Sequence, residues 1–132
     1  MSKKCILGSI IHSVQFGSVE VIKEGALIFN DLGVIEALLD ASLPASKPIL
    51  AAIDPSNVLD HSNKLIIPGF VDAHCHAPQY YFTGTGVDMD LMQWLETYTF
   101  PVEARFKDLE FARKVYEKSV KRHLKSGTTF AS

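Results

Sequence analysis

Residues 68–76 read Pro-Gly-Phe-Val-Asp-Ala-His-Cys-His, which predicts a short strand that ends in polar side chains. Side chains alternate between the two faces of a strand, so His74 and His76 should point to one side and Cys75 to the other. Two imidazoles on one face at the carboxyl end of a strand form half of a metal site, and neutral imidazole suits zinc. We expect Asp72 on the same face, where its carboxylate would orient a ligand. A chance pair of exposed histidines is the alternative interpretation.

A catalytic zinc ion usually takes three protein ligands and keeps one position open for water. The other histidines of the sequence are His12, His61 and His123. We expect His12 in a strand, His61 in a loop and His123 on a helix surface, each solvated or packed rather than bound to metal. The remaining ligands are therefore expected outside these 132 residues.

The segment after the histidines predicts a strand–helix–strand unit. We expect a loop over residues 77–88, a short helix over residues 90–97, a break at Pro101, a long helix over residues 108–125 and a strand over residues 128–131. A strand, a helical crossover and a second strand imply a parallel sheet.

The long helix carries its own start and stop signals. Asp108 is the expected N-cap and Gly127 the C-terminal stop, and apolar residues recur between them at helical spacing. Two oppositely charged pairs, four residues apart, are expected on the outer face: Glu110 with Lys114, and Glu117 with Lys121.

Residues 1–64 predict an antiparallel meander of short strands. The expected strands are residues 5–11, 19–22, 26–29 and 34–39, with turns at residues 23–25 and 30–33. Residues 41–63, which contain three prolines, predict a connecting loop with one helical turn.

The composition is that of an ordinary globular domain. Hydrophobic residues make up 47% of the 132 residues, and 13 Lys and Arg against 15 Asp and Glu give a net charge of −2. This near-neutral charge does not support a nucleic-acid or anionic-membrane partner. No apolar run approaches the roughly 18 residues of a membrane span. Two cysteines, Cys5 and Cys75, form no disulfide framework and predict reduced thiols in a cytoplasmic protein.

The 68–76 motif resembles the first barrel strand of the amidohydrolase superfamily, whose pattern is Pro-Gly-hydrophobic-hydrophobic-Asp-x-His-x-His. Ser126-Gly127-Thr128-Thr129 is similar to the opening of the second barrel strand. The resemblance implies an α/β chain with a β-sandwich part, in which residues 1–64 belong to the sandwich. Residues 65–132 would begin a (β/α)₈ TIM barrel, as strand 1, crossover helices and the start of strand 2. Because such a barrel takes about 250 residues, we expect an incomplete barrel, from a fragment, an incomplete gene model or a short isoform.

Two further segments resemble the guanine deaminase family. These are His76-Ala77-Pro78-Gln79 and the stretch from Trp94 to Phe106, Trp-Leu-Glu-Thr-Tyr-Thr-Phe-Pro-Val-Glu-Ala-Arg-Phe. The resemblance implies zinc-dependent hydrolytic deamination of guanine to xanthine and ammonia, in purine catabolism, by a homodimeric enzyme. It implies His74 and His76 as zinc ligands, with no catalytic acid or base expected within this chain. The implied substrate-binding residues are His76, Ala77, Pro78, Gln79, Leu91 and Trp94.

Other interpretations remain open. Leu91 and Trp94 have the spacing of core residues, and Gln79 without the family context is an exposed loop residue. A related aminohydrolase with a different heterocyclic substrate is one alternative, although the Trp94–Phe106 segment argues against it. A truncated, non-catalytic product with an unpaired apolar strand edge is the other. We expect the isolated chain to lack deaminase activity and to retain zinc weakly.

Overall fold

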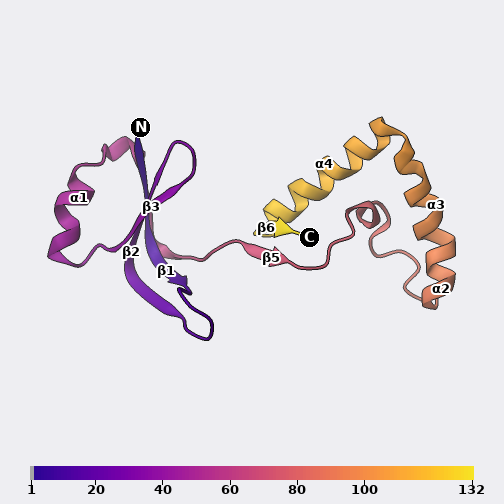
Figure 1. Ribbon diagram of the computed structural model, residues 1–132, viewed down its shortest axis with the longest axis horizontal. Helices are drawn as coiled ribbons and strands as arrows, with labels where there is room; N and C mark the ends of the chain where they lie inside the picture. The colour runs from indigo at the N-terminus through magenta and orange to yellow at the C-terminus, as the bar shows by residue number, and fades with distance from the viewer. Residues whose placement is uncertain (1) are drawn as a thin grey trace. The chain divides into compact units, whose positions relative to one another are not determined.

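The computed structural model describes residues 2–132, which form two compact units. The first unit ends at Pro68 and the second begins at Gly69 (Figure 1). The boundary expected after residue 64 falls inside the last strand of the first unit, because Leu65 and Ile66 pair with the first strand.

The first unit contains a four-stranded mixed sheet in the order β3-β2-β1-β4. Neighbours β1 and β2, and β2 and β3, are antiparallel, as the expected meander requires, whereas β1 and β4 are parallel. The strands are β1 Lys3–His12, β2 Glu20–Asn30, β3 Ile35–Asp40 and β4 Val58–Ile66. Cys5, Ala26, Ile28 and Ile53 form the buried core of this unit.

The turn expected at residues 23–25 is wrong, because β2 runs through it without a break. Gly25 pairs with Gly8 in the neighbouring strand, and a Cβ at Gly25 would lie 2.5 Å from the Ile10 side chain. This glycine therefore permits close packing between strands instead of a turn. The chain actually reverses between β1 and β2, where Gly17 has a φ of 79°.

The turn expected at residues 30–33 is confirmed. Asn30 Oδ1 accepts hydrogen bonds from the backbone N–H groups of Leu32 and Val34, at 3.0 and 3.1 Å. Gly33 has a φ of 77°, which favours glycine at that position. The side chain and the glycine together join β2 to β3.

The loop expected over residues 41–63 is correct only in its first part. It contains helix α1, Lys47–Ala51, flanked by 3₁₀ turns at Pro44–Ser46 and Pro55–Asn57. Strand β4 then begins at Val58. Its polar sequence gives little strand signal, and pairing with β1 supplies the backbone hydrogen bonds that hold it extended.

The second unit is the predicted strand–helix–strand arrangement. Strands β5, Phe70–Asp72, and β6, Thr128–Ala131, are parallel, and helix α4, Leu109–Lys125, lies between them in the chain (Figure 1). The N–H of Phe70 donates to the carbonyl of Gly127 at 2.8 Å, which joins the start of β5 to the end of the helical crossover.

The predicted break at Pro101 is wrong, because residues 91–107 are helical throughout. The Phe100 N–H donates to the carbonyl of Leu95, five residues back, in a π-helical turn. Proline normally clashes with the carbonyl four residues before it, and a widened turn relieves this crowding. The segments are α2 Leu91–Trp94, a π-helical turn Leu95–Thr99, α3 Phe100–Glu103 and a 3₁₀ turn Ala104–Lys107.

The long helix α4 forms as predicted. The Asp108 side chain accepts hydrogen bonds from the N–H groups of Glu110 and Phe111, and Gly127 follows the helix with a φ of 86°. Both expected ion pairs are present on the exposed face, Glu110 with Lys114 at 2.7 Å and Glu117 with Lys121 at 2.9 Å. Across residues 2–132, no helix combines the length and apolar character needed to cross a bilayer.

Candidate functional site

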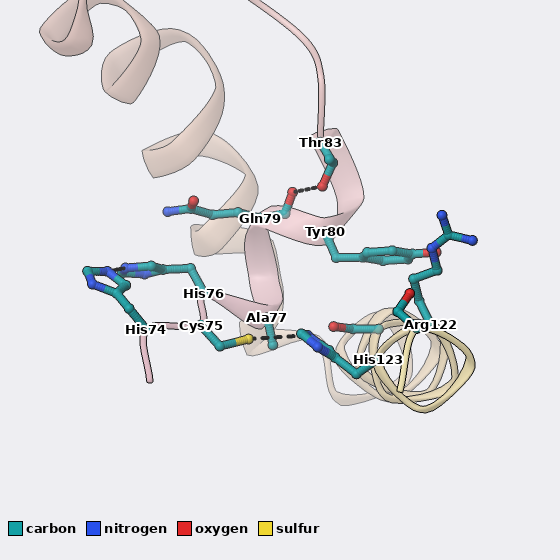
Figure 2. A pocket seen from close by; sticks show the side chains of 11 residues that line it. His74, Cys75, His76, Ala77, Gln79, Tyr80, Thr83, Arg122 and His123 are labelled. Atoms are coloured by element: carbon teal, nitrogen blue, oxygen red, sulfur yellow. Dashed lines mark hydrogen bonds between the residues drawn. The ribbon is translucent and has the colours of Figure 1, made fainter. Parts of the chain in front are cut away.

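The two histidines of the motif aim ring nitrogens at a common point. They follow β5, and His74 Nε2 lies 2.7 Å from His76 Nε2 (Figure 2). Two ligand nitrogens of a tetrahedral zinc ion are about 3.4 Å apart, given Zn–N distances of about 2.0–2.1 Å. The rings therefore need to separate by less than about 1 Å to share an ion. Both side chains are exposed, and the donor pair fits a divalent metal.

Cys75 points away from the histidines, as side-chain alternation predicts. Its Sγ lies 3.4 Å from Nε2 of His123, on helix α4 (Figure 2). His123 is therefore packed against the strand end, which is one of the two environments expected for it.

The predicted position of Asp72 is wrong. Its carboxylate does not join the histidine pair but lies within 4.8 Å of the ligand atoms of Cys75 and His123. The backbone N–H of His74 donates to Asp72 Oδ1 at 3.1 Å. This hydrogen bond curls the chain just after β5 and turns the carboxylate toward the helix.

An open pocket of about 450 Å³ contains these side chains. It lies where the chain leaves β5, between the 3₁₀ helix Ala77–Phe82 and α4 (Figure 2). The lining residues are His74, Cys75, His76, Ala77, Gln79, Tyr80, Thr83, Ser119, Arg122, His123 and Ser126.

Gln79 is brought to the histidine pair by the first turn of the 3₁₀ helix. Its backbone N–H donates to the carbonyl of His76 at 2.9 Å, and its carbonyl accepts from the Thr83 hydroxyl at 3.1 Å. Figure 2 shows the side-chain amide extending to the same side as the two imidazoles. These two hydrogen bonds fix the backbone of Gln79 and therefore the point from which its side-chain amide extends.

Three of the predicted substrate residues lie outside this pocket: Pro78, Leu91 and Trp94. Trp94 packs against Phe82, with ring centroids 5.4 Å apart, and its Nε1–H donates to the carbonyl of Thr85 at 3.1 Å. Leu91 is 69% exposed. Their contribution to ligand binding stays a prediction.

Several lining residues were missed in the sequence. They include Ser119 and Arg122 on α4 and Ser126 at its C-cap, which lie on the same side as His123 because their spacing is three or four residues. That spacing was a usable signal. Tyr80 and Thr83 carried no comparable signal, because a 3₁₀ helix was not predicted there.

No cluster of three possible metal ligands includes His74 or His76 among the described residues 2–132. The three-residue cluster that the structure does contain is Asp72, Cys75 and His123.

Residues 65–132 match the model of the amidohydrolase family. The chain belongs to the amidohydrolase family. The matched segment contains β5, α4, β6 and all the residues of the pocket.

Relatives of this amidohydrolase include guanine deaminases. The guanine deaminase of Dictyostelium discoideum is 42% identical, over 96% of this chain and 30% of the relative. The guanine deaminase of Homo sapiens is 38% identical, over 94% of this chain and 28% of the relative. The chain thus spans under a third of the length of these curated relatives.

Solved structures of guanine deaminases also superpose on this amidohydrolase. The guanine deaminase of C. acetobutylicum, with guanine bound in its active site, superposes with a TM-score of 0.78 at 32% identity, covering 98% of this chain and 29% of that structure. E. coli guanine deaminase superposes with a TM-score of 0.79 at 31% identity, covering 99% of this chain and 29% of that structure.

Proposed function

We propose that this amidohydrolase chain takes part in the hydrolytic deamination of guanine to xanthine and ammonia. One observation carries the proposal: two imidazole nitrogens converge to 2.7 Å beside the side-chain amide of Gln79 in one open pocket. The guanine bound to the C. acetobutylicum enzyme supports guanine as the substrate.

We propose that His74 and His76 hold a zinc ion. A bound zinc ion supplies Lewis-acid chemistry and lowers the pKa of water toward about 7, which provides a nucleophile at neutral pH. The two side chains fix the position of that chemistry through the backbone after β5, where the His74 N–H is anchored to Asp72. A catalytic zinc usually takes three protein ligands, so a further ligand must complete this pair.

Gln79 is proposed to recognise the purine. Its amide offers two donor hydrogens and one acceptor oxygen, which match the mixed donor and acceptor edge of guanine. Ala77 and Pro78 start the 3₁₀ helix that aims this amide, and Ala77 also lines the pocket. Leu91 and Trp94 are proposed to add apolar surface against the base, since purine sites are largely apolar.

The proposed architecture follows from the same relationship. Residues 69–132 would be the first strand, crossover and second strand of a (β/α)₈ barrel, whose active site lies at the carboxyl ends of the strands. His74 and His76 follow the carboxyl end of β5, which is the position this architecture demands. Residues 2–68 would belong to a β-sandwich part.

The experiment uses the 132-residue chain and a chimera in which it replaces the aligned part of the Dictyostelium discoideum enzyme. Guanine loss is followed by absorbance and ammonia release by a coupled assay, with added zinc. We expect no turnover by the chain alone, because two ligands leave the metal site incomplete, and guanine turnover by the chimera.

Variants of the chimera separate the proposed roles. His74→Ala and His76→Ala should abolish turnover and lower the bound zinc, whereas Gln79→Ala should raise KM by about tenfold through loss of a hydrogen bond to the base. A folded chimera that leaves guanine untouched, or that prefers adenine or cytosine, would refute guanine as the substrate. Full activity in His76→Ala would refute the metal assignment.

A further inference from the structure

Cys75, His123 and Asp72 form a group of possible metal ligands that the proposed deamination does not use. Their ligand atoms lie within 4.8 Å of one another, and all three residues are partly buried. We propose that this cluster is a second metal site, which binds Zn²⁺ through a thiolate, an imidazole and a carboxylate. It lies apart from the pair formed by His74 and His76, because Cys75 points to the opposite side (Figure 2).

The distances suit an ion at this position. In a tetrahedral zinc site with Zn–S near 2.3 Å and Zn–N near 2.0 Å, the sulfur and nitrogen are about 3.5 Å apart. Cys75 Sγ and His123 Nε2 are 3.4 Å apart, so these two ligand atoms need almost no movement. The carboxylate of Asp72, within 4.8 Å of both, has to approach by up to about 1.5 Å to reach the same ion. The nitrogens of His74 and His76, at 2.7 Å, need to move further before they share an ion.

The donor chemistry selects the ion. A thiolate is a soft ligand that favours zinc over magnesium or calcium, which prefer oxygen ligands. The negative charges of the Cys75 thiolate and the Asp72 carboxylate balance a divalent cation, and neutral His123 completes the set. A simple hydrogen bond between Cys75 and His123 would need no carboxylate beside it.

Asp72 is held in place for this role. Its Oδ1 accepts the backbone N–H of His74 at 3.1 Å, and this contact orients the carboxylate toward the cluster. Cys75 and His123 line the open pocket, so an ion and a completing water molecule can enter from solvent.

The site would connect two elements of the second unit. Asp72 ends β5, Cys75 follows it, and His123 belongs to the last turns of α4. An ion bound to all three would fix the backbone between Asp72 and Cys75 to the helix. That backbone also carries His74, so the ion would be structural support for the neighbouring histidine pair.

The test follows binding of Co²⁺ to the purified chain, because Co²⁺ takes the place of Zn²⁺ and a Co²⁺–thiolate bond gives a near-ultraviolet charge-transfer band. We expect the band to appear on titration and to disappear on addition of Zn²⁺. Cys75→Ser should abolish it. His76→Ala should keep it, because the histidine pair contains no sulfur. Cys5→Ser should also keep it, because Cys5 is buried in the other unit.

The other two ligands are tested by affinity. His123→Ala and Asp72→Asn should each weaken Co²⁺ binding about tenfold or more, as loss of a ligand or its support does. A wild-type chain without the band, a band that survives Cys75→Ser, or an unchanged affinity in His123→Ala would each overturn the proposal.

Thiol protection gives a measurement that needs no cysteine variant. Zn²⁺ should slow alkylation of Cys75 by iodoacetamide about tenfold or more in the wild type and in His76→Ala, but not in His123→Ala, with the modified cysteine identified by mass spectrometry. Equal alkylation with and without Zn²⁺ in the wild type would overturn the proposal. Neither measurement depends on guanine turnover. If only the deaminase proposal fails, the Co²⁺ band and the protection of Cys75 by Zn²⁺ should still be observed.

Discussion

Gly69 shows how a single residue couples two motifs of the sequence. A Cβ at this position would lie 2.1 Å from Oγ1 and 2.3 Å from Cγ2 of Thr129, in strand β6. Gly69 precedes β5, and Thr129 belongs to the Gly-Thr-Thr segment that opens β6. The glycine is therefore required by close packing between two segments that are distant in the sequence.

Gly69→Ala should destabilise the second unit by about 1–3 kcal/mol, because the added methyl group overpacks against Thr129. The measurement is urea unfolding followed by circular dichroism. Thr129→Gly in the same chain should recover part of the loss, with a coupling energy of about 0.5–3 kcal/mol in a double-mutant cycle. Thr129→Ser keeps the Cβ and the hydroxyl, so it should recover less. Additive effects of Gly69→Ala and Thr129→Gly would contradict the contact.

The two cysteines illustrate how position decides chemistry. Burial raises the pKa of the Cys5 thiol, and its side chain is only 1% exposed. Cys75 instead lies at the rim of an open pocket against His123. Of the two, only Cys75 is placed to bind an ion.

At the scale of elements, helix α4 organises the second unit. Ala112, Val115 and Ser119 form its buried face, and its exposed face carries two ion pairs between residues four apart. Such pairs contribute only about 0.3–0.5 kcal/mol each at the surface. The N-cap and the buried face therefore account for more of the helix's stability.

Asp108→Ala should lower the free energy of unfolding by about 1 kcal/mol, because the N–H groups of Glu110 and Phe111 lose their acceptor. Urea unfolding monitored by helical circular dichroism measures the change. Asp88→Ala is a suitable control, because Asp88 lies in a turn outside the helices and does not cap α4. Equal losses in the two variants would show that the cap does not stabilise α4.

At the scale of the whole molecule, carboxylates beside serines make the first unit sensitive to acid. Hydrogen bonds from the serine two residues later lower the pKa of Asp40, Asp54 and Asp60. A lowered pKa in the folded state means that the contribution to stability is complete above the ordinary carboxyl pKa. It is lost as the pH falls through the lowered value.

Removing the hydrogen bonds from the serine hydroxyls should reduce the acid sensitivity, while the backbone N–H donors remain. In a chain with Ser42→Ala, Ser56→Ala and Ser62→Ala, the free energy of unfolding at neutral pH should be lower, and it should fall less on acidification. Urea unfolding of both chains across the acid range measures this. Added salt should change the difference little, because hydrogen bonds from serine are the largest cause of the lowered pKa values, and only Asp60 also has a charged neighbour, His61. An unchanged pH profile would contradict this account.

Local signals in the sequence were sufficient where short-range physics decides the structure. The Asn30–Gly33 turn and helix α4 with its Asp108 cap all formed as predicted. Side-chain alternation correctly separated His74 and His76 from Cys75. Each of these depends on residues close together in the chain, whose hydrogen bonds and faces follow from backbone geometry.

The wrong secondary-structure predictions fall where pairing with a segment distant in the chain determines the local structure. Gly25 indicated a turn, but pairing with Gly8 keeps it inside β2. Residues 58–60 indicated a loop, but pairing with β1 makes them part of strand β4. These residues gain their backbone hydrogen bonds from another segment, and no local pattern reports that gain.

The sequence by itself predicted that His74 and His76 lie on one side of the chain and Cys75 on the other, and that a long helix follows over residues 108–125. It indicated Gln79 only through the resemblance to a known family. Only the tertiary structure decided that Asp72 turns from the pair toward Cys75, and that His123 meets them from α4. Alternation failed for Asp72 because the chain bends between Asp72 and His74, where the N–H of His74 donates to Asp72 Oδ1. The contact with His123 joins residues 48 positions apart, and it forms because the crossover brings the helix back to its strand.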